Sequence, residues 1–125
     1  MNEAKFCLEL KKSLRQQGWF IKFHGGQFAE PGVPDLLGCV KGKFVAIECK
    51  LKAGKLSETQ RQQLNYIAKN NGKSYVIIYN RDCTALVNNY IYYNDVINNY
   101  KPLFYLYRQP GGAWDVSKLI EDILT

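Results

Sequence analysis

The sequence contains two carboxylates and an ammonium that could together form a catalytic or metal-binding site, namely Asp35, Glu48 and Lys50. The apolar run from Lys43 to Lys50 predicts a strand, and because side chains alternate faces along a strand, Glu48 and Lys50 share one side of it. Another expected strand, from Asp35 to Val40, precedes it, and a hairpin would bring Asp35 to the same end. Two carboxylates and an ammonium would then converge. The alternative for Glu48 and Lys50 is a simple ion pair at the rim of a sheet.

Two converging carboxylates are a partial ligand shell for a hard divalent cation. Mg²⁺ and Mn²⁺ prefer oxygen ligands and usually keep several waters, so Asp35, Glu48 and the main-chain carbonyl of Cys49 would suit either ion. Lys50 beside the ion could orient an attacking water, help to deprotonate it and offset charge on a phosphate. The arrangement therefore predicts a metal-dependent hydrolase that acts on phosphodiester bonds.

The elements that must hold these residues follow from the hydrophobic periodicity and the turn signals of the first part of the chain. Apolar side chains at helical spacing predict a first helix, which Gly18 ends. Ser57 is the expected N-cap of a helix with Leu64 on its inward face. The strand after that helix should run parallel to the strand of Glu48, because crossover connections are right-handed. The expected elements are a helix over residues 3 to 17, strands from Trp19 to Phe23, Asp35 to Val40 and Lys43 to Lys50, a helix after Ser57 that ends at Asn70-Asn71-Gly72, and a strand from Ser74 to Tyr79.

Residues 81 to 125 are less regular and are expected to extend this α/β core. Asn and Tyr crowd the segment NNYIYYNDVINNY, and LFYLY follows Pro102, which predicts further strands and turns. Asp115 is the expected cap of a last short helix, whose apolar stripe includes Leu119 and Ile123. The chain is thus predicted to be a single nuclease domain over residues 1–125, with the catalytic core in 1–80 and an extension in 81–125.

The composition is that of a globular protein. Of the 125 residues, 46% are hydrophobic and 14% aromatic, which supports one core but not two domains of ordinary size. No apolar run reaches the roughly 20 residues that span a bilayer, and the first residues lack the apolar stretch of a secretory signal. We therefore expect a cytoplasmic protein. Its 4 cysteines include no C-x-x-C pair of the kind found in zinc sites, so we expect reduced and mostly buried thiols.

The net charge of +6 is concentrated in one part of the chain. Residues 1–80 hold 13 Lys or Arg against 6 Asp or Glu, whereas residues 81–125 hold 4 against 5. A basic surface favours a polyanion, because neutralising phosphates releases counterions, although many basic domains bind no nucleic acid. The charge therefore agrees with a phosphodiester substrate without requiring one.

The segment PGVPDLLGCVKGKFVAIECK resembles the signature of the PD-(D/E)XK nucleases, with Pro34-Asp35 and Glu48-Cys49-Lys50 as its two halves. It is most similar to the small phage-type VRR-NUC members, and the resemblance covers roughly residues 1 to 80. The resemblance implies a restriction-endonuclease-like fold with an α-β-β-β-α-β core. It also implies a Mg²⁺- or Mn²⁺-dependent deoxyribonuclease, in which Asp35 and Glu48 bind the metal and Lys50 assists the water. A phage or prophage origin and selectivity for DNA junctions or flaps would follow from the same likeness.

Two more site residues follow from the resemblance. Family members often carry a glutamate in the first helix, and Glu3 and Glu9 both qualify here. Glu3 lies on the helix face of the apolar residues and Glu9 on the polar face, so Glu3 is the better candidate. The alternative for Glu3 is a favourable charge at a helix N-terminus. Gln60 matches a glutamine early in the helix after the E-x-K motif, where it would touch metal-bound water or substrate; otherwise it faces solvent.

Phosphate contacts are expected from basic residues and glycines near the proposed site. His24 is the only histidine and precedes Gly25 and Gly26, so it is a candidate phosphate contact, with a structural role as the alternative. The glycines would let backbone amides approach a phosphate, although their role in a turn also explains them. The candidate DNA-binding residues are Lys22, His24, Gly25, Gly26, Lys41, Lys43, Lys52 and Lys55.

The function predicted from these observations is that of a structure-selective DNA endonuclease. Symmetric cutting of two strands would require two copies of so small a chain, and the aromatic segments Tyr90 to Tyr93 and Leu103 to Tyr107 suit a homodimer interface. Alternatively, those segments extend the sheet of the monomer. Two other functions stay open: a catalytically silent DNA-binding module of the same fold, and a phage-encoded protein whose basic surface binds another protein.

Overall fold

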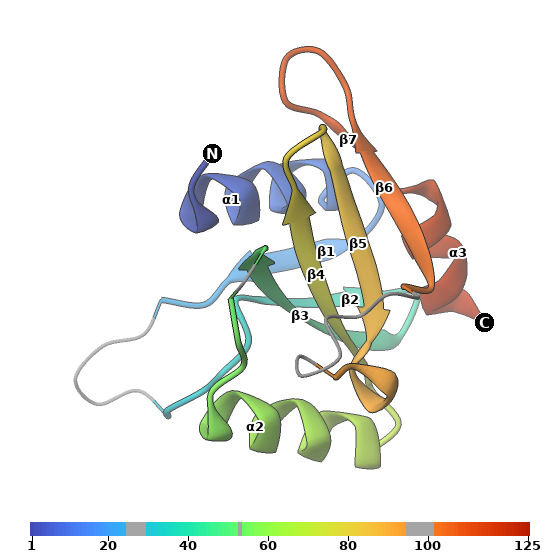
Figure 1. The fold of residues 1–125 in the computed structure, drawn as a ribbon. Coiled ribbons are helices and arrows are strands. Elements are labelled where there is room, and N and C mark those ends of the chain that lie inside the picture. Colours follow the sequence, from blue (N-terminus) through green and yellow to red (C-terminus); the bar gives the residue numbers. More distant parts are fainter. Residues whose placement is uncertain (25–29, 53, 95–101) are drawn as a thin grey trace.

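The computed structural model describes residues 1–24, 30–52, 54–94 and 102–125. Their strands form one seven-stranded sheet in which each strand lies beside its neighbour in the sequence. The sheet curls, so that the first strands cross the direction of the later ones (Figure 1). The elements are α1 (Glu3–Leu14), β1 (Trp19–Lys22), β2 (Leu36–Val40), β3 (Lys43–Leu51), α2 (Glu58–Lys69), β4 (Lys73–Asn80), β5 (Thr84–Asn89), the 3₁₀ helix η1 (Tyr90–Tyr92), β6 (Phe104–Arg108), β7 (Trp114–Asp115) and α3 (Ser117–Leu124).

The pairing of the strands agrees with the order predicted from the sequence. β2 and β3 form an antiparallel hairpin, and α2 carries the chain across to β4, which is parallel to β3. Lys41 and Gly42 make the hairpin turn with φ angles of 48° and 84°, the left-handed pair that two-residue turns between twisted strands require. This turn fixes the register, and the register decides which residues meet at the open end of the hairpin.

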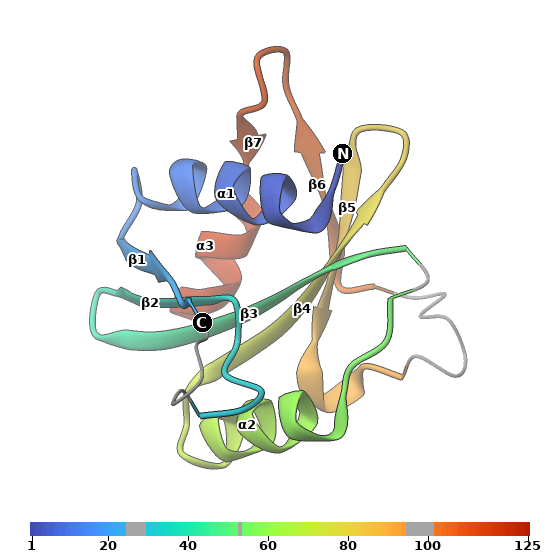
Figure 2. The same cartoon turned by 90° about the vertical axis from the view of Figure 1, so that its left-hand side faces the viewer.

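Helices cover both faces of the sheet. Phe6, Leu10 and Leu14 of α1 are fully buried and pack with Leu119 and Ile123 of α3 against one face. Leu64 of α2 belongs to a smaller apolar cluster on the other face. Figure 2 shows α1 and α3 on one side of β3 and α2 on the other. Successive residues of β3 therefore point to different surroundings, as the alternation in its sequence predicts.

Side chains cap the N-termini of α1 and α2, and the helix bounds depart from the prediction in two places. Asn2 accepts a hydrogen bond from the backbone N–H of Lys5 at the start of α1, which ends at Leu14 rather than at residue 17. Asp115 is not the N-cap of α3, because the helix begins one residue later than expected, after Val116. Asp115 instead lies in β7 and accepts hydrogen bonds from the backbone and hydroxyl of Ser117.

The cysteines are divided between core and surface. Cys7 and Cys49 are buried, whereas Cys39 and Cys83 are exposed, so the prediction of mostly buried thiols is wrong for half of them. All four are free thiols. Cys39 lies in an apolar run, but β2 alternates faces and turns this side chain to solvent.

The segment after residue 80 continues the sheet through β5, β6 and β7. Tyr93 and Leu106 are buried, so part of the aromatic and aliphatic surface is used within the monomer. Among the described residues of this part, the large apolar side chains that stay exposed are Ile91, Tyr92, Leu103, Tyr105, Tyr107 and Leu124. Among the described residues, no helix combines the length and the apolar character needed to cross a membrane.

Candidate active site

Asp35 and Glu48 meet at the open end of the β2–β3 hairpin. Leu36 pairs with Ile47, so the antiparallel register places Asp35, one residue earlier, beside Glu48. Asp35 Oδ2 accepts a hydrogen bond of 2.8 Å from the backbone N–H of Cys49, which holds its carboxylate against β3. The backbone carbonyl of Asp35 accepts from the N–H of Phe23, so β1 fixes this residue from the other side.

The Glu48 carboxylate is buried and only half satisfied. The residue is 1% exposed, and its Oε1 accepts a hydrogen bond of 3.1 Å from Gln60 Nε2. Its Oε2 has no hydrogen-bond partner within the described part of the chain. Burial, and then the negative charge of the adjacent Asp35, raise the pKa of Glu48 to about 9. Two carboxylates are therefore held together where their charges oppose one another.

Lys50 lies two residues beyond Glu48 on the same face of β3 and is 8% exposed. Its positive charge favours the ionised form of Glu48. The two side chains nevertheless form no direct ion pair, and the Glu48 carboxylate accepts a hydrogen bond from Gln60 instead. The simple ion pair considered from the sequence is therefore not present. The Lys50 ammonium lies near the two carboxylates without forming an ion pair with Glu48.

The donor set fits a hard divalent cation. A buried, unpartnered carboxylate oxygen costs free energy, and a second carboxylate beside it adds repulsion, so a bound cation would relieve both. Asp35 and Glu48 offer carboxylate oxygens. Cys49 turns its N–H toward Asp35, and because the N–H and C=O of one strand residue point to the same side, its carbonyl faces this end of the hairpin as well.

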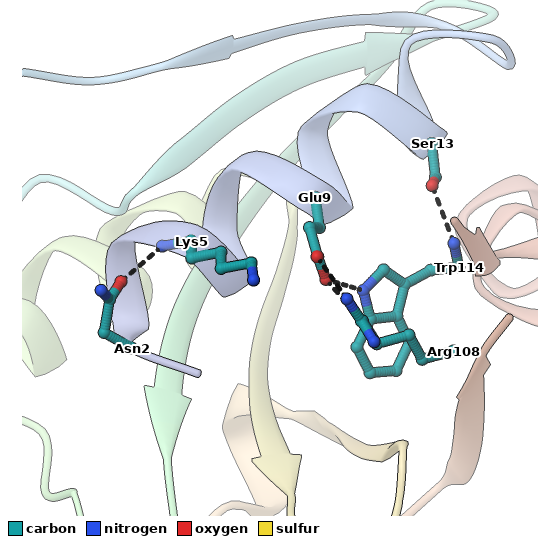
Figure 3. Close-up of polar contacts among 6 residues, drawn as sticks. All are labelled: Asn2, Lys5, Glu9, Ser13, Arg108 and Trp114. Carbon is teal, nitrogen blue, oxygen red and sulfur yellow. Dashed lines mark hydrogen bonds and ion pairs between the residues drawn. The ribbon is translucent and has the colours of Figure 1, made fainter. Parts of the chain in front are cut away.

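The structure separates the two candidate glutamates of α1. Glu3 is exposed in the first turn, and its negative charge is among the causes that raise the pKa of Glu48, which puts it on the side of the site. Glu9 instead accepts hydrogen bonds from Arg108 and from the indole N–H of Trp114 (Figure 3). Those bonds, Arg108 foremost, hold the pKa of Glu9 below its usual range. Glu9 therefore joins α1 to the C-terminal segment.

Gln60 connects the start of α2 to the site. Its Oε1 accepts a hydrogen bond from the N–H of Ser57, and its own N–H donates to the Ser57 hydroxyl, which completes the capping box of α2. Its Nε2 donates to Glu48. The solvent-facing alternative for Gln60 is thus wrong, because its amide orients one of the two acids.

The candidate phosphate contacts fall into two groups. Lys22 lies close enough for its charge to lower the pKa of Cys7, and Lys52 and Lys55 follow β3 at the same end of the sheet. Lys41 and Lys43 lie at the closed end of the hairpin, across the 5 residues of β2, and so about 16 Å from Asp35. These two lysines are therefore not beside the acids, and their contact with DNA stays a prediction. His24 is exposed just after β1, and Gly25 and Gly26 lie outside the described residues.

A solved structure shares this arrangement of elements. It is that of Hjc, a Holliday junction resolvase from the archaeal hyperthermophile Archaeoglobus fulgidus, with a TM-score of 0.57 and 19% sequence identity over 70% of this chain and 77% of that chain. The chain has the restriction-endonuclease-like fold. The fold class predicted from the sequence is thereby confirmed. No protein-family model matches the sequence, and no curated protein matches it.

Arg81 is a basic residue just beyond the end of β4 that the sequence interpretation did not single out. It follows β4, whose Tyr79 pairs in parallel with Leu51 of β3, so both strands end at the same edge. Arg81 and Lys52 line a hollow of about 360 Å³ together with Met1, Leu51 and Tyr79. The rule that parallel strands end at a common edge, where ligands of α/β proteins often bind, could have indicated Arg81 from the predicted β4 strand alone.

Proposed function

We propose that this protein is a metal-dependent endonuclease that hydrolyses DNA phosphodiester bonds, with a preference for branched DNA such as junctions or flaps. The observation that carries the proposal is the buried Oε2 of Glu48, which has no hydrogen-bond partner among the described residues and lies beside Asp35. Natural proteins rarely leave such an atom unsatisfied unless something binds there. A divalent cation is the ligand that two adjacent carboxylates favour.

Each residue of the site then has a distinct task. Asp35, Glu48 and the main-chain carbonyl of Cys49 would hold Mg²⁺ or Mn²⁺, which when bound stabilises negative charge developing on the phosphate and makes water more acidic. Gln60 fixes the orientation of Glu48 through its amide. Lys50, next to the acids on the same face, would orient the attacking water and offset phosphate charge. Glu3 would contribute a further carboxylate from α1.

Branched DNA is proposed as the substrate for two reasons. Lys22 pairs with Leu36, the residue after Asp35. Lys52, Lys55 and Arg81 follow the C-terminal ends of β3 and β4, and this basic character suits a polyanion. The fold is also that of a protein named as a Holliday junction resolvase. The narrower assignment to the VRR-NUC nucleases and the phage origin stay predictions from the sequence motif.

We also propose that two copies act together. Ile91, Tyr92, Tyr105 and Tyr107 leave large apolar surface exposed on the part of the chain that is nearly neutral, and aromatic residues are enriched in buried interface centres. Light scattering at micromolar concentration should give twice the chain mass of 14.4 kDa. A mass near 14.4 kDa together with symmetric cutting would contradict the dimer.

The function is tested with the purified chain on labelled junction, flap, duplex and single-stranded DNA. With Mg²⁺ we expect cleavage of junction or flap in preference to duplex, and no cleavage in excess EDTA. Ca²⁺ should support binding without cleavage, because its looser coordination positions water poorly. Cleavage that continues in excess chelator would overturn the metal site.

The alternatives give different outcomes in the same assay. DNA binding without cleavage, under all metals and unchanged by Asp35→Asn, would identify a silent DNA-binding module of this fold. Absence of both binding and cleavage would favour a protein partner for the basic surface. Either outcome would end the proposal of a nuclease.

A further inference from the structure

The geometry points to a second kind of metal site: we propose that Cys7, Cys49 and Asp35 bind a thiophilic divalent cation such as Zn²⁺. The two sulfur atoms and a carboxylate oxygen of Asp35 all lie within 4.8 Å of one another. Cys7 comes from α1, Cys49 from β3, and Asp35 immediately precedes β2, so the three ligands converge from three separate elements. Their spacing along the sequence has none of the short intervals of a zinc motif.

The distances suit such a cation. Zinc binds cysteine sulfur at about 2.3 Å and carboxylate oxygen at about 2.1 Å, which places two sulfurs of a tetrahedral site about 3.8 Å apart. Ligand atoms that already lie within 4.8 Å need to close by no more than about 1 Å. Three protein ligands leave the fourth position for water, as in zinc sites that are not purely structural.

The donor atoms and the side of the strand distinguish this site from the proposed magnesium site. Sulfur ligands favour soft cations, whereas Mg²⁺ takes oxygen. The Cys49 side chain belongs to the core cluster beneath α1, while Glu48 on the opposite face of β3 contacts Gln60 of α2. Asp35 stands between the two and is the residue that both sites share.

Packing of the apolar core does not by itself require two thiols and a carboxylate to lie so close together. A buried free cysteine usually acts as a small apolar side chain, and Cys7 and Cys49 are 1% and 0% exposed. Here, however, a carboxylate oxygen of Asp35 lies within 4.8 Å of both sulfurs. On binding, the two thiols would release their protons to solvent. The resulting two thiolates and the carboxylate carry three negative charges, and a divalent cation would leave one, which offsets the cost of burying them.

Occupancy would have a consequence for catalysis, and this consequence alone rests on the proposed nuclease function. The cation would engage the carboxylate of Asp35 and compete for it with Mg²⁺. Zinc binding itself depends only on the three ligands, so it can be measured without DNA and without cleavage.

The test uses the full chain with Cys39→Ser and Cys83→Ser, which removes the two exposed thiols and leaves Cys7 and Cys49 in place. Calorimetry with zinc alone should show one equivalent bound, and Co²⁺ in its place should give the absorption of a tetrahedral thiolate complex. Adding Cys7→Ser to this background should weaken zinc binding by roughly 100-fold. Equal affinity in the two proteins, or no binding by the background protein, would overturn the site.

A second measurement covers the case in which Cys7→Ser fails to fold, as judged by circular dichroism. In the background protein, one equivalent of zinc should slow the reaction of the two remaining thiols with a thiol reagent by roughly tenfold or more. An unchanged rate with zinc present would overturn the proposal without any substitution near the site.

Discussion

Glu9 is partly buried and Glu48 is fully buried, and the fold treats these two carboxylates in opposite ways. Glu9 Oε1 accepts from Arg108 Nε at 2.9 Å and from Trp114 Nε1 at 3.1 Å, and Oε2 accepts from the Arg108 guanidinium at 2.8 Å. Glu48 receives one hydrogen bond, from Gln60, and leaves Oε2 without a partner among the described residues. The pKa of Glu9 is lowered, while that of Glu48 is raised to about 9.

The two glutamates differ in whether their carboxylate oxygens already have hydrogen-bond partners within the fold. The contacts of Glu9 fasten α1 to the end of the chain, and the backbone N–H of Trp114 adds a hydrogen bond to Ser13 of the same helix (Figure 3). The charge of Glu9 is already balanced by Arg108 and both of its oxygens accept hydrogen bonds, so this carboxylate is not available to bind a ligand. Glu48 is held in place with one oxygen unsatisfied, and the cation of the proposed function would offset the free energy that this costs.

The largest expected effect is on cleavage. Asp35→Asn and Lys50→Ala should each lower the cleavage rate by a factor on the order of 100 or more, about 2.7 kcal/mol in the barrier, while DNA binding and the folded state persist. Single-turnover kinetics on the preferred DNA substrate would measure this. Loss of the folded state in either variant would instead indicate that these residues act as structural partners, like Glu9.

Opposite effects on stability should separate the two glutamates. In the metal-free protein, the folded state keeps Glu48 protonated where the unfolded chain ionises it, so stability falls as the pH rises from about 4.5 to about 9. Glu48→Gln keeps an acceptor for the Gln60 amide and removes the titrating group. The variant should therefore be more stable than the native protein at pH 8, by a few kcal/mol, which is the order of magnitude that the raised pKa of Glu48 implies.

Glu9→Gln should destabilise the protein at neutral pH, the opposite of the effect expected for Glu48→Gln. The pKa of Glu9 is lowered in the folded state, so its stabilising contribution is complete above the pKa of the unfolded chain and disappears as the pH falls through the folded value. The variant should melt at a lower temperature at neutral pH, and the difference should vanish in acid. Thermal melts of both variants from pH 3 to 9 would measure this. Two curves of the same sign would contradict the comparison.

A smaller effect is expected from Glu3. If it supplies a carboxylate to the site, Glu3→Gln should slow cleavage by about tenfold, close to 1.4 kcal/mol, without changing the melting temperature. Glu9→Gln is the matched control on the same helix and should cleave at nearly the normal rate once folded. Normal cleavage by Glu3→Gln with slow cleavage by Glu9→Gln would reverse the assignment of the two residues.

The smallest effect concerns the loop that leads to Asp35. Gly32 has a φ of 78°, and a Cβ there would lie 2.3 Å from the backbone of Thr59 at the start of α2. Gly32→Ala should therefore displace the loop and lower cleavage by a few-fold, through the positions of Asp35 and Gln60. Gly42→Ala, with a φ of 84° and open space around it, is the control for the backbone strain alone. Equal cleavage by the two variants would show that this contact does not position the site.

The central residues of the candidate site, Asp35, Glu48 and Lys50, could be predicted from the sequence alone. Alternation along β3 places Glu48 and Lys50 on one face, and the Lys41-Gly42 turn fixes a register that sets Asp35 beside Glu48. These are local relations within one hairpin, so short-range rules suffice. The N-cap Ser57 of α2 was likewise predicted from the sequence, although the capping box that Gln60 completes was not.

Partners that lie far apart in the chain could be identified only from the three-dimensional packing. Glu9 meets Arg108 across 99 residues, and a helical wheel records only that Glu9 shares a face with lysines, not that the C-terminal segment covers this face. Cys7 reaches Cys49 because α1 packs on β3, which no spacing motif encodes. The docking of a helix on a sheet depends on side-chain packing over the whole core, and periodicity specifies the apolar face without specifying what it will touch.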